Sequence, residues 1–332
     1  MTSPCESFRL VRPTGHEARR GLYCLIGGPE HLRGPDAAWS ERTHSVRDEM
    51  LVAQVQQFEA FAAGLGIKAD HQVMAFDGKS VAATCLWVPS PGRSAMLFAP
   101  NLNQFPKAAA AVEACVRAAL ADAASADVAL VQVMLEPEDE LGAGTFARAG
   151  LHRLATLIYM ERTPPPAAPS VQLPAGLRLQ EYGPACHAAL RKVVLGSYEQ
   201  TLDCPALSGL RDIEDVLAGH KAVGRFDPAL WTLVLEGDTP LGCLLLAEIP
   251  NRHALDLVYL GLLPAARGRG IGRALMQRMF ATGRERGFEV LTLAVDEGNA
   301  PALRLYHRFG FTPVTRRVAL IRKLDGPSSG PL

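Results

Sequence analysis

A run of prolines near the middle of the chain separates two stretches that predict the same elements in the same order. The run covers residues 163–169 and contains four prolines. Serial prolines cannot donate hydrogen bonds to a helix or a sheet, and they hold an extended conformation. A chain of 332 residues that is 48% hydrophobic is long enough for two domains with separate cores. We therefore expect a domain at 1–162, a Pro-rich linker at 163–174, a second domain at 175–325 and a disordered tail at 326–332.

The two halves repeat one order of strands and helices. Each half opens with a short strand and a helix, and then predicts a hairpin around a turn that contains Asp and Gly, at Asp77-Gly78 and at Gly237-Asp238. Each half continues with strand, helix, strand, helix and strand. The predicted ranges are 96–100, 108–124, 128–135, 142–149 and 154–160 in the first half, and 255–263, 271–286, 290–295, 301–309 and 318–322 in the second. This order predicts an internal duplication of mixed α/β class.

Charge and cysteine usage exclude several kinds of partner. Acidic and basic side chains number 34 each, so no net charge draws the chain to nucleic acid or to an anionic membrane. The seven cysteines are scattered and never form a CxxC pair, and no histidines have metal-ligand spacing. No apolar run approaches the roughly 18 residues of a membrane span. We expect a soluble cytoplasmic protein with reduced thiols and no metal.

A glycine-rich turn between strand 255–263 and helix 271–286 is the most informative motif. It contains Gly268, Gly270 and Gly272. The first N–H groups of a helix lack partners inside the helix and carry the positive end of its dipole, so they bind anions. Glycines let the backbone approach such an anion closely. The turn predicts a pyrophosphate site, with added positive charge from Arg267, Arg269 and Arg273.

Two other phosphate-binding loops fit this turn poorly. A P-loop ends in Gly-Lys-Ser or Gly-Lys-Thr, whereas this turn ends in Gly272-Arg273-Ala274. A dinucleotide-binding GxGxxG fingerprint needs its third glycine one place later than Gly272.

The motif resembles the signature of the GNAT superfamily of N-acetyltransferases. The family pattern Arg/Gln-x-x-Gly-x-Gly/Ala matches Arg267, Gly270 and Gly272, after an apolar-x-Pro lead at 262–264. A second family pattern, Asn-x-x-Ala-x-x-x-Tyr followed by Gly-Phe, matches at the expected distance downstream, through Asn299, Ala302, Tyr306, Gly310 and Phe311. The resemblance implies two tandem GNAT-like domains, each with a mixed, mostly antiparallel sheet flanked by helices.

The resemblance also implies roles for single residues. Main-chain amides of the glycine-rich turn would hold the pyrophosphate of coenzyme A, and the end of the preceding strand would bind its pantetheine arm in a gap beside strand 290–295. Asn299 would steady the cofactor, although it is equally placed to cap the helix before Pro301. The cofactor-binding set is Leu262, Leu263, Arg267, Gly268, Arg269, Gly270, Ile271, Gly272, Arg273 and Asn299.

Acetyl transfer to an amine needs a proton acceptor and a proton donor. The resemblance implies that Tyr306 is the general acid. For the base we consider Glu248 and Asp256, at the facing ends of neighbouring strands. Three polar residues lie where GNAT enzymes vary the cover of the acceptor groove, namely Tyr198, Glu199 and Asp203, and a plain solvated loop is the alternative there. We expect Cys204 to be an ordinary thiol and not a nucleophile, because no histidine partner can be assigned to it.

The first half departs from the family pattern at both motifs. Residues 101–107 follow an apolar-x-Pro lead but contain no glycine, and Phe146 stands where Tyr306 stands in the second half. We therefore expect a degenerate first domain and one site for acetyl-CoA, with a small-molecule or peptide amine as acceptor. A CoA-responsive binding protein without turnover is the alternative, and transfer of a longer acyl chain is a third.

Overall fold

The computed structural model describes residues 8–28, 46–64, 71–167 and 170–324. They form two compact units. The first unit comprises Met1–Arg153 together with Ala319–Leu332, and the second comprises Leu154–Val318. The predicted tail at 326–332 lies outside the described residues.

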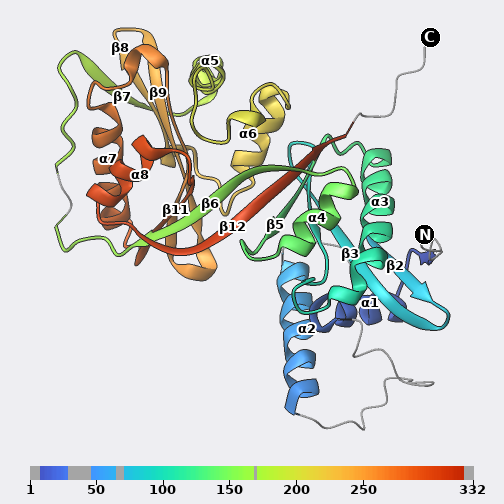
Figure 1. Cartoon of the computed structure of the whole chain (residues 1–332). Coiled ribbons are helices and arrows are strands. Elements are labelled where there is room, and N and C mark those ends of the chain that lie inside the picture. Colours follow the sequence, from blue (N-terminus) through green and yellow to red (C-terminus); the bar gives the residue numbers. More distant parts are fainter. Residues whose placement is uncertain (1–7, 29–45, 65–70, 168–169, 325–332) are drawn as a thin grey trace, which may run out of the picture. The chain divides into compact units, whose positions relative to one another are not determined.

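The first unit is a mixed sheet with helices on both faces (Figure 1). Alternate residues of the long central strand β3 face opposite ways, so Leu86 and Val88 pack with α1 and α2, while Cys85 and Ala83 contact α3. Its strands are β1 (Arg9–Val11), β2 (Gln72–Asp77), β3 (Ser80–Ser90), β4 (Ser94–Phe98) and β5 (Leu130–Leu135). Its helices are α1 (His16–Gly27), α2 (Val46–Gly64), α3 (Ala109–Ser125) and α4 (Glu140–Arg148).

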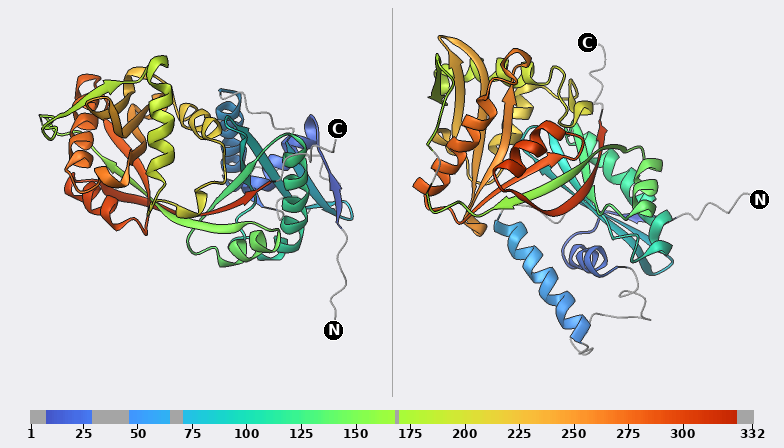
Figure 2. Two further views of the ribbon diagram at one scale, coloured as in Figure 1. Left: turned by 90° about the horizontal axis from the view of Figure 1, so that it is seen from above. Right: turned by 60° about the vertical axis from the view of Figure 1, so that its left-hand side comes forward.

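The second unit has a sheet of the same kind, with α7 and α8 over one face and α5 and α6 over the other (Figures 1 and 2). One apolar core joins these helices to the strands. The strands are β6 (His152–Arg162), β7 (Leu177–Glu181), β8 (Trp231–Glu236), β9 (Thr239–Ile249), β10 (Ala254–Leu262) and β11 (Val290–Asp296). The helices are α5 (His187–Ser197), α6 (Ile213–Lys221), α7 (Ile271–Glu285) and α8 (Ala300–Arg308).

The strand order confirms the predicted duplication and fold class. In the first unit β1, β2, β3 and β4 pair antiparallel in turn, and β5 joins β4 in parallel. In the second unit β7, β8, β9 and β10 pair antiparallel in turn, and β11 joins β10 in parallel. Both predicted hairpins form around the Asp- and Gly-containing turns.

The last strand of each half joins the other unit, which differs from the predicted boundary at 163–174. Strand β6 ends the first half of the sequence, yet it pairs antiparallel with β11 of the second unit, from Leu157↔Asp296 to Arg162↔Leu291. Strand β12 (Thr312–Lys323) ends the second half, and from Ala319 onward it belongs to the first unit beside β5. Each sheet thus fills an otherwise free edge with a strand from the other half of the sequence.

Candidate functional site

The pairing between strands β10 and β11 ends about halfway along their length. Their parallel pairing runs from Ala254↔Val290 to Leu257↔Leu293 and ends there. A bulge between Leu257 and Tyr259 interrupts the pairing of β10 with β9 at the same level. A bulge bends a strand, and beyond this one the edge of β10 that pairs with β11 is no longer paired. A cavity of about 680 Å³ lies there, lined by residues 257–262 of β10 and by Ala294 and Val295 of β11.

The glycine-rich turn and the start of α7 form one end of this cavity. Gly268 and Gly270 both have positive φ, at 74° and 81°, where residues with a Cβ are strained. Gly270 is the N-cap of α7, and no side chain caps the helix. The first N–H groups of α7 therefore remain available for an anion. Gly272 also lines the cavity, and a Cβ added there would lie 3.4 Å from the Leu305 side chain.

Some arginines near the turn are bound by other groups of the protein, and others are available to a ligand. Arg267 donates to the carbonyl oxygens of Leu262, Ser197, Glu199 and Gln200 at 2.8–3.3 Å, so it ties the turn to the end of α5. Arg269 pairs with Glu236 at 2.6 Å. These two predicted phosphate ligands are therefore engaged by the protein itself.

Three other arginines line the cavity and have no hydrogen bond or ion pair to any described residue. One is the predicted Arg273, and the others are Arg304 and Arg308 on α8, which sequence reasoning missed. Their spacing of four places Arg304 and Arg308 on one face of the helix. That spacing is visible in the sequence, but only the fold shows that this face borders the cavity.

Helix α8 carries both remaining motif residues. Asn299 is its N-cap, where the side-chain oxygen accepts from the amide of Ala302 at 3.3 Å and Pro301 lies in the first turn. Tyr306 is buried and lines the cavity, and its hydroxyl has no hydrogen-bond partner in the described part of the chain. Burial, and next the charge of Asp203, raise the pKa of Tyr306, so the hydroxyl keeps its proton and can donate.

The two predicted bases lie outside the cavity lining. Glu248 is bound by Arg225. The carboxylate of Asp256 accepts from the Thr292 hydroxyl at 2.5 Å, at the level where β10 and β11 are still paired. Burial raises the pKa of Asp256, which suits a base, but the carboxyl group is directed to β11.

The predicted acceptor-side residues are not all brought together. Tyr198 and Asp203 line the cavity, whereas Glu199 is exposed and outside the lining. Burial raises the pKa of Cys204, which also lines the cavity, to about 12, so it is a protonated thiol and a poor nucleophile. The predicted Leu263 and Ile271 flank the turn without lining the cavity, and Ile271 is fully buried.

An aromatic cluster lines part of the cavity; it contains the predicted Tyr198 together with Tyr259 and His220, which the sequence did not indicate. Tyr259 of β10 bonds through its hydroxyl to the Ser197 hydroxyl at 2.7 Å, and the His220 ring stacks on it with centroids 5.3 Å apart. Tyr198 meets Tyr259 edge to face. Burial lowers the pKa of His220 to about 4, so this histidine is neutral. This part of the cavity wall is therefore aromatic and carries no histidine charge.

No group of three or more His, Cys, Asp or Glu side chains among the described residues is arranged to hold a metal ion. None of the described helices is both long and apolar enough to cross a membrane.

Comparison with known proteins identifies the family of the second unit. Residues 200–311 match the model of the Acetyltransferase (GNAT) family. The mycothiol acetyltransferase of Beutenbergia cavernae is 33% identical over 188 residues, which cover 52% of this chain and 61% of that protein. The mycothiol acetyltransferase of Mycolicibacterium paratuberculosis is 33% identical over 215 residues, 60% of this chain and 65% of that protein. The chain thus spans less than two thirds of these relatives.

A solved structure extends the likeness to the whole fold. The GCN5-related N-acetyltransferase from Sphaerobacter thermophilus matches with a TM-score of 0.57 over 96% of this chain and 97% of that chain, at 19% identity. Together these matches confirm the resemblance drawn from the two motifs. Residues 200–311 of the second unit match a GNAT acetyltransferase domain.

Proposed function

We propose that the protein transfers an acetyl group from acetyl-CoA to a primary amine of a small molecule or a peptide. The observation that carries this proposal is the cavity between the parted ends of β10 and β11, which leads to the uncapped start of α7. An extended thioester arm with a pyrophosphate at its far end fits such a site. The names of the curated relatives support a small-molecule acceptor.

The residues present suit coenzyme A at each part of its length. Amides at Gly270 and the first turn of α7 would bind the pyrophosphate, and Arg273, Arg304 and Arg308 would balance its charge. The unpaired edge of β10 beyond Leu257 offers main-chain donors and acceptors to the amide groups of the pantetheine arm.

The reaction breaks the C–S bond of the thioester and forms a C–N bond to the acceptor. Tyr306 has a free, protonated hydroxyl on the cavity wall, so it can donate to the departing thiolate. Direct attack by the amine is sufficient, because Cys204 is held as a thiol.

A titration and a turnover assay test the proposal. Isothermal titration of the whole chain with acetyl-CoA should show about one site per chain. Incubation with acetyl-CoA and ethanolamine, glucosamine, glycinamide or spermidine should release the CoA thiol, and mass spectrometry should find the acetylated amine. Absence of acetyl-CoA binding would refute the proposal.

A CoA-responsive binding protein is the second candidate. The observation that favours it is the engagement of both predicted bases, Glu248 by Arg225 and Asp256 by Thr292. Such a protein would bind acetyl-CoA but release no thiol with any amine, so the same pair of assays separates the two functions.

A further inference from the structure

One carboxylate lines the cavity, and it belongs to the loop after α5. Of the acidic side chains in the described residues, Asp203 alone is part of the cavity lining. The same wall carries Tyr306 and Asn299. We propose that Asp203 binds the ammonium group of the acceptor and then takes its proton, an inference that rests on the proposed acetyl transfer.

The Asp203 carboxylate is held by two donors. The amide of Asp296, the last residue of β11, donates to Asp203 Oδ1 at 3.2 Å. The side chain of Asn299 also hydrogen-bonds the carboxylate, while its oxygen caps α8. Asn299 is therefore a positioning residue for Asp203 as well as a helix cap.

The neighbouring Asp296 fixes the loop from the other side. Its carboxylate accepts from the amide of Cys204 at 2.9 Å and from the amide of Gly298 at 2.8 Å. The loop itself is bounded by two residues of positive φ, Gln200 at 52° and Cys204 at 45°. Non-glycine residues keep this conformation only where contacts hold them, so Asp203 is placed rather than mobile.

The charges around Asp203 indicate a cationic ligand. The titratable groups that face it are Asp296 on β11, Tyr306 on α8, Tyr259 on β10, and Tyr198 and Cys204 beside it on the chain. None of these is a cation, and no ion pair among the described residues involves either carboxylate. The buried carboxylate of Asp296 and the cavity-exposed carboxylate of Asp203 lie beside one another without a counter-ion among the described residues, and such a pair attracts a cation. The ammonium group of a protonated amine is such a cation.

The same surroundings make Asp203 a better proton acceptor. Burial raises its pKa, the donors at Asp296 and Asn299 lower it, and the Asp296 charge raises it further, with a net rise above 3.8. A base whose pKa approaches that of its partner is more effective in proton transfer.

The step balances in protons and bonds. The acceptor ammonium gives one proton to Asp203 and becomes a neutral amine, whose nitrogen attacks the thioester carbon. The C–N bond forms, the C–S bond breaks, and Tyr306 protonates the thiolate and recovers a proton from the amide nitrogen. Asp203 then releases its proton to solvent, and the products are the acetylated amine and free CoA.

The test compares Asp203→Asn, Asp203→Glu and the control Asp238→Asn. Asp238 lies fully exposed in the β8–β9 turn, outside the cavity lining. With the best amine of the panel, Asp203→Asn should lower kcat/KM about 100-fold or more. Its acetyl-CoA affinity should stay within about twofold of the wild type. Asp203→Glu should recover part of the activity, and Asp238→Asn should match the wild type.

A pH profile and chemical rescue separate catalysis from folding. The wild-type kcat/KM for the amine should fall in acid as Asp203 takes up a proton, and Asp203→Asn should lack that acidic limb. Formate should partly restore Asp203→Ala, because it supplies a small carboxylate. An unchanged acidic limb in Asp203→Asn, or wild-type activity in that variant, would overturn the inference. If the wild type itself bound acetyl-CoA but released no thiol, the proposed function would fail instead.

Discussion

Both units contain the same pair of diverging parallel strands, but their ends differ: a cavity lies between them in the second unit, and a side-chain hydrogen bond links them in the first. In the first unit β4 and β5 pair from Ser94↔Leu130 to Met96↔Gln132 and then separate, as β10 and β11 do. Beyond that point the Asn101 side chain donates to Glu136 at 3.2 Å and joins the two strand ends. A shared topology therefore does not make a shared site; the side chains at the strand ends decide it.

The turn that follows the first of the two parallel strands also differs between the units. Where the second unit has Gly268, Gly270 and Gly272, the first unit has Leu102 and Phe105, both buried. The Phe105 ring lies so close to Gly28 that a side chain at Gly28 would collide with it. The segment that corresponds to the glycine-rich turn is thus anchored by buried apolar side chains in the first unit, whereas Gly268 and Gly270 of the second unit are exposed.

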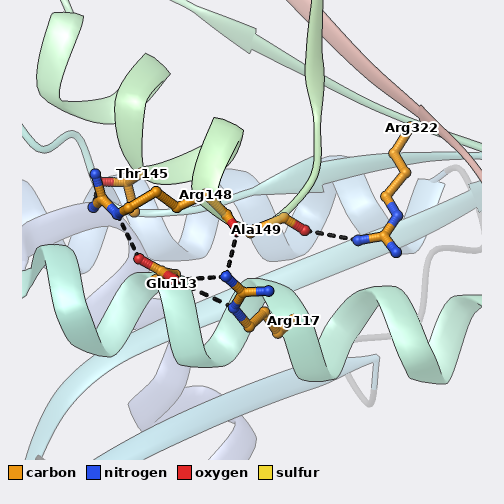
Figure 3. Close-up of polar contacts among 6 residues, drawn as sticks. All are labelled: Glu113, Arg117, Thr145, Arg148, Ala149 and Arg322. Carbon is orange, nitrogen blue, oxygen red and sulfur yellow. Dashed lines mark hydrogen bonds and ion pairs between the residues drawn. The ribbon is translucent and has the colours of Figure 1, made fainter. Parts of the chain in front are cut away.

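The helices that follow show a third difference. In the first unit Glu113 of α3 binds Arg148 of α4 at 2.7 Å and Arg117 at 2.8 Å, and Arg117 also donates to the Arg148 carbonyl oxygen (Figure 3). Arg148 occupies the position of Arg308, two residues after the aromatic residue that aligns with Tyr306. No hydrogen bond or ion pair among the described residues joins α7 and α8. In the first unit Arg148 links α4 to α3, whereas in the second unit Arg308 is available to a ligand.

The largest effect should come from filling the open turn. Gly270→Val places a β-branched residue at φ 81°, a strained conformation, at the N-cap position next to the first amides of α7. We expect about a 100-fold loss of acetyl-CoA affinity, which is ~2.7 kcal/mol, measured by isothermal titration. Gly287→Val is the matched control, because Gly287 follows the other end of α7 at φ 72° with open space around it. Equal affinities in the two variants would remove the turn from the binding site.

Substitutions at the aligned residues Tyr306 and Phe146 compare the two units directly. Tyr306→Phe removes the donor but keeps the ring, so kcat should fall about 100-fold while the Kd for acetyl-CoA stays within about twofold. Phe146→Tyr adds a hydroxyl at the equivalent place in the first unit and should add no activity, because the gap there is bridged. Thiol release by each variant measures both effects. A Tyr306→Phe variant with full turnover would show that another group protonates the thiolate.

Substitution of the aligned arginines should have smaller effects, on acetyl-CoA affinity at Arg308 and on stability at Arg148. Arg308→Ala should weaken acetyl-CoA about five- to tenfold and reduce the salt dependence of binding, because a free cation near the phosphates is lost. Arg148→Ala should leave that affinity unchanged and lower the Tm, because it breaks the contact with Glu113. Titrations at two salt concentrations and thermal melts measure these results. Weaker acetyl-CoA binding in Arg148→Ala would contradict the comparison.

The sequence predicted local order better than contacts between distant segments. The two hairpins, the strand–turn–helix at Gly270 and the cap at Asn299 depend on neighbouring residues, and the structure contains all of them. The exchange of β6 and β12 depends on which sheet edge each strand finds, and no local signal encodes that choice. For the same reason the sequence could not show that Asp203 reaches Asn299, or that Arg267 is engaged by the end of α5.

The smallest predicted effect concerns the closed helix pair and its response to pH. Burial alone would raise the pKa of Glu113, but the hydrogen bonds and charges of Arg148 and Arg117 outweigh it and lower the pKa below 4.5. Because the folded-state pKa is the lower one, the contact stabilises the first unit above pH 4.5 and is lost as the pH falls through the folded-state value. Glu113→Gln should cost roughly 0.5–1 kcal/mol at neutral pH.

The pH dependence of that cost distinguishes the contact from a general loss of stability. Denaturant unfolding of the wild type and Glu113→Gln should give free energies of unfolding that converge as the pH falls below 4.5, where the wild-type carboxylate takes up a proton too. Glu138→Gln is the control, since Glu138 is exposed and its side chain has no partner in the described part of the chain. A gap between wild type and Glu113→Gln that stays constant with pH would mean that the arginines hold α3 and α4 together without this charge. In that case apolar packing would hold α3 and α4 together, and the first unit would differ from the second only in the turn that precedes the helix, where Phe105 is buried.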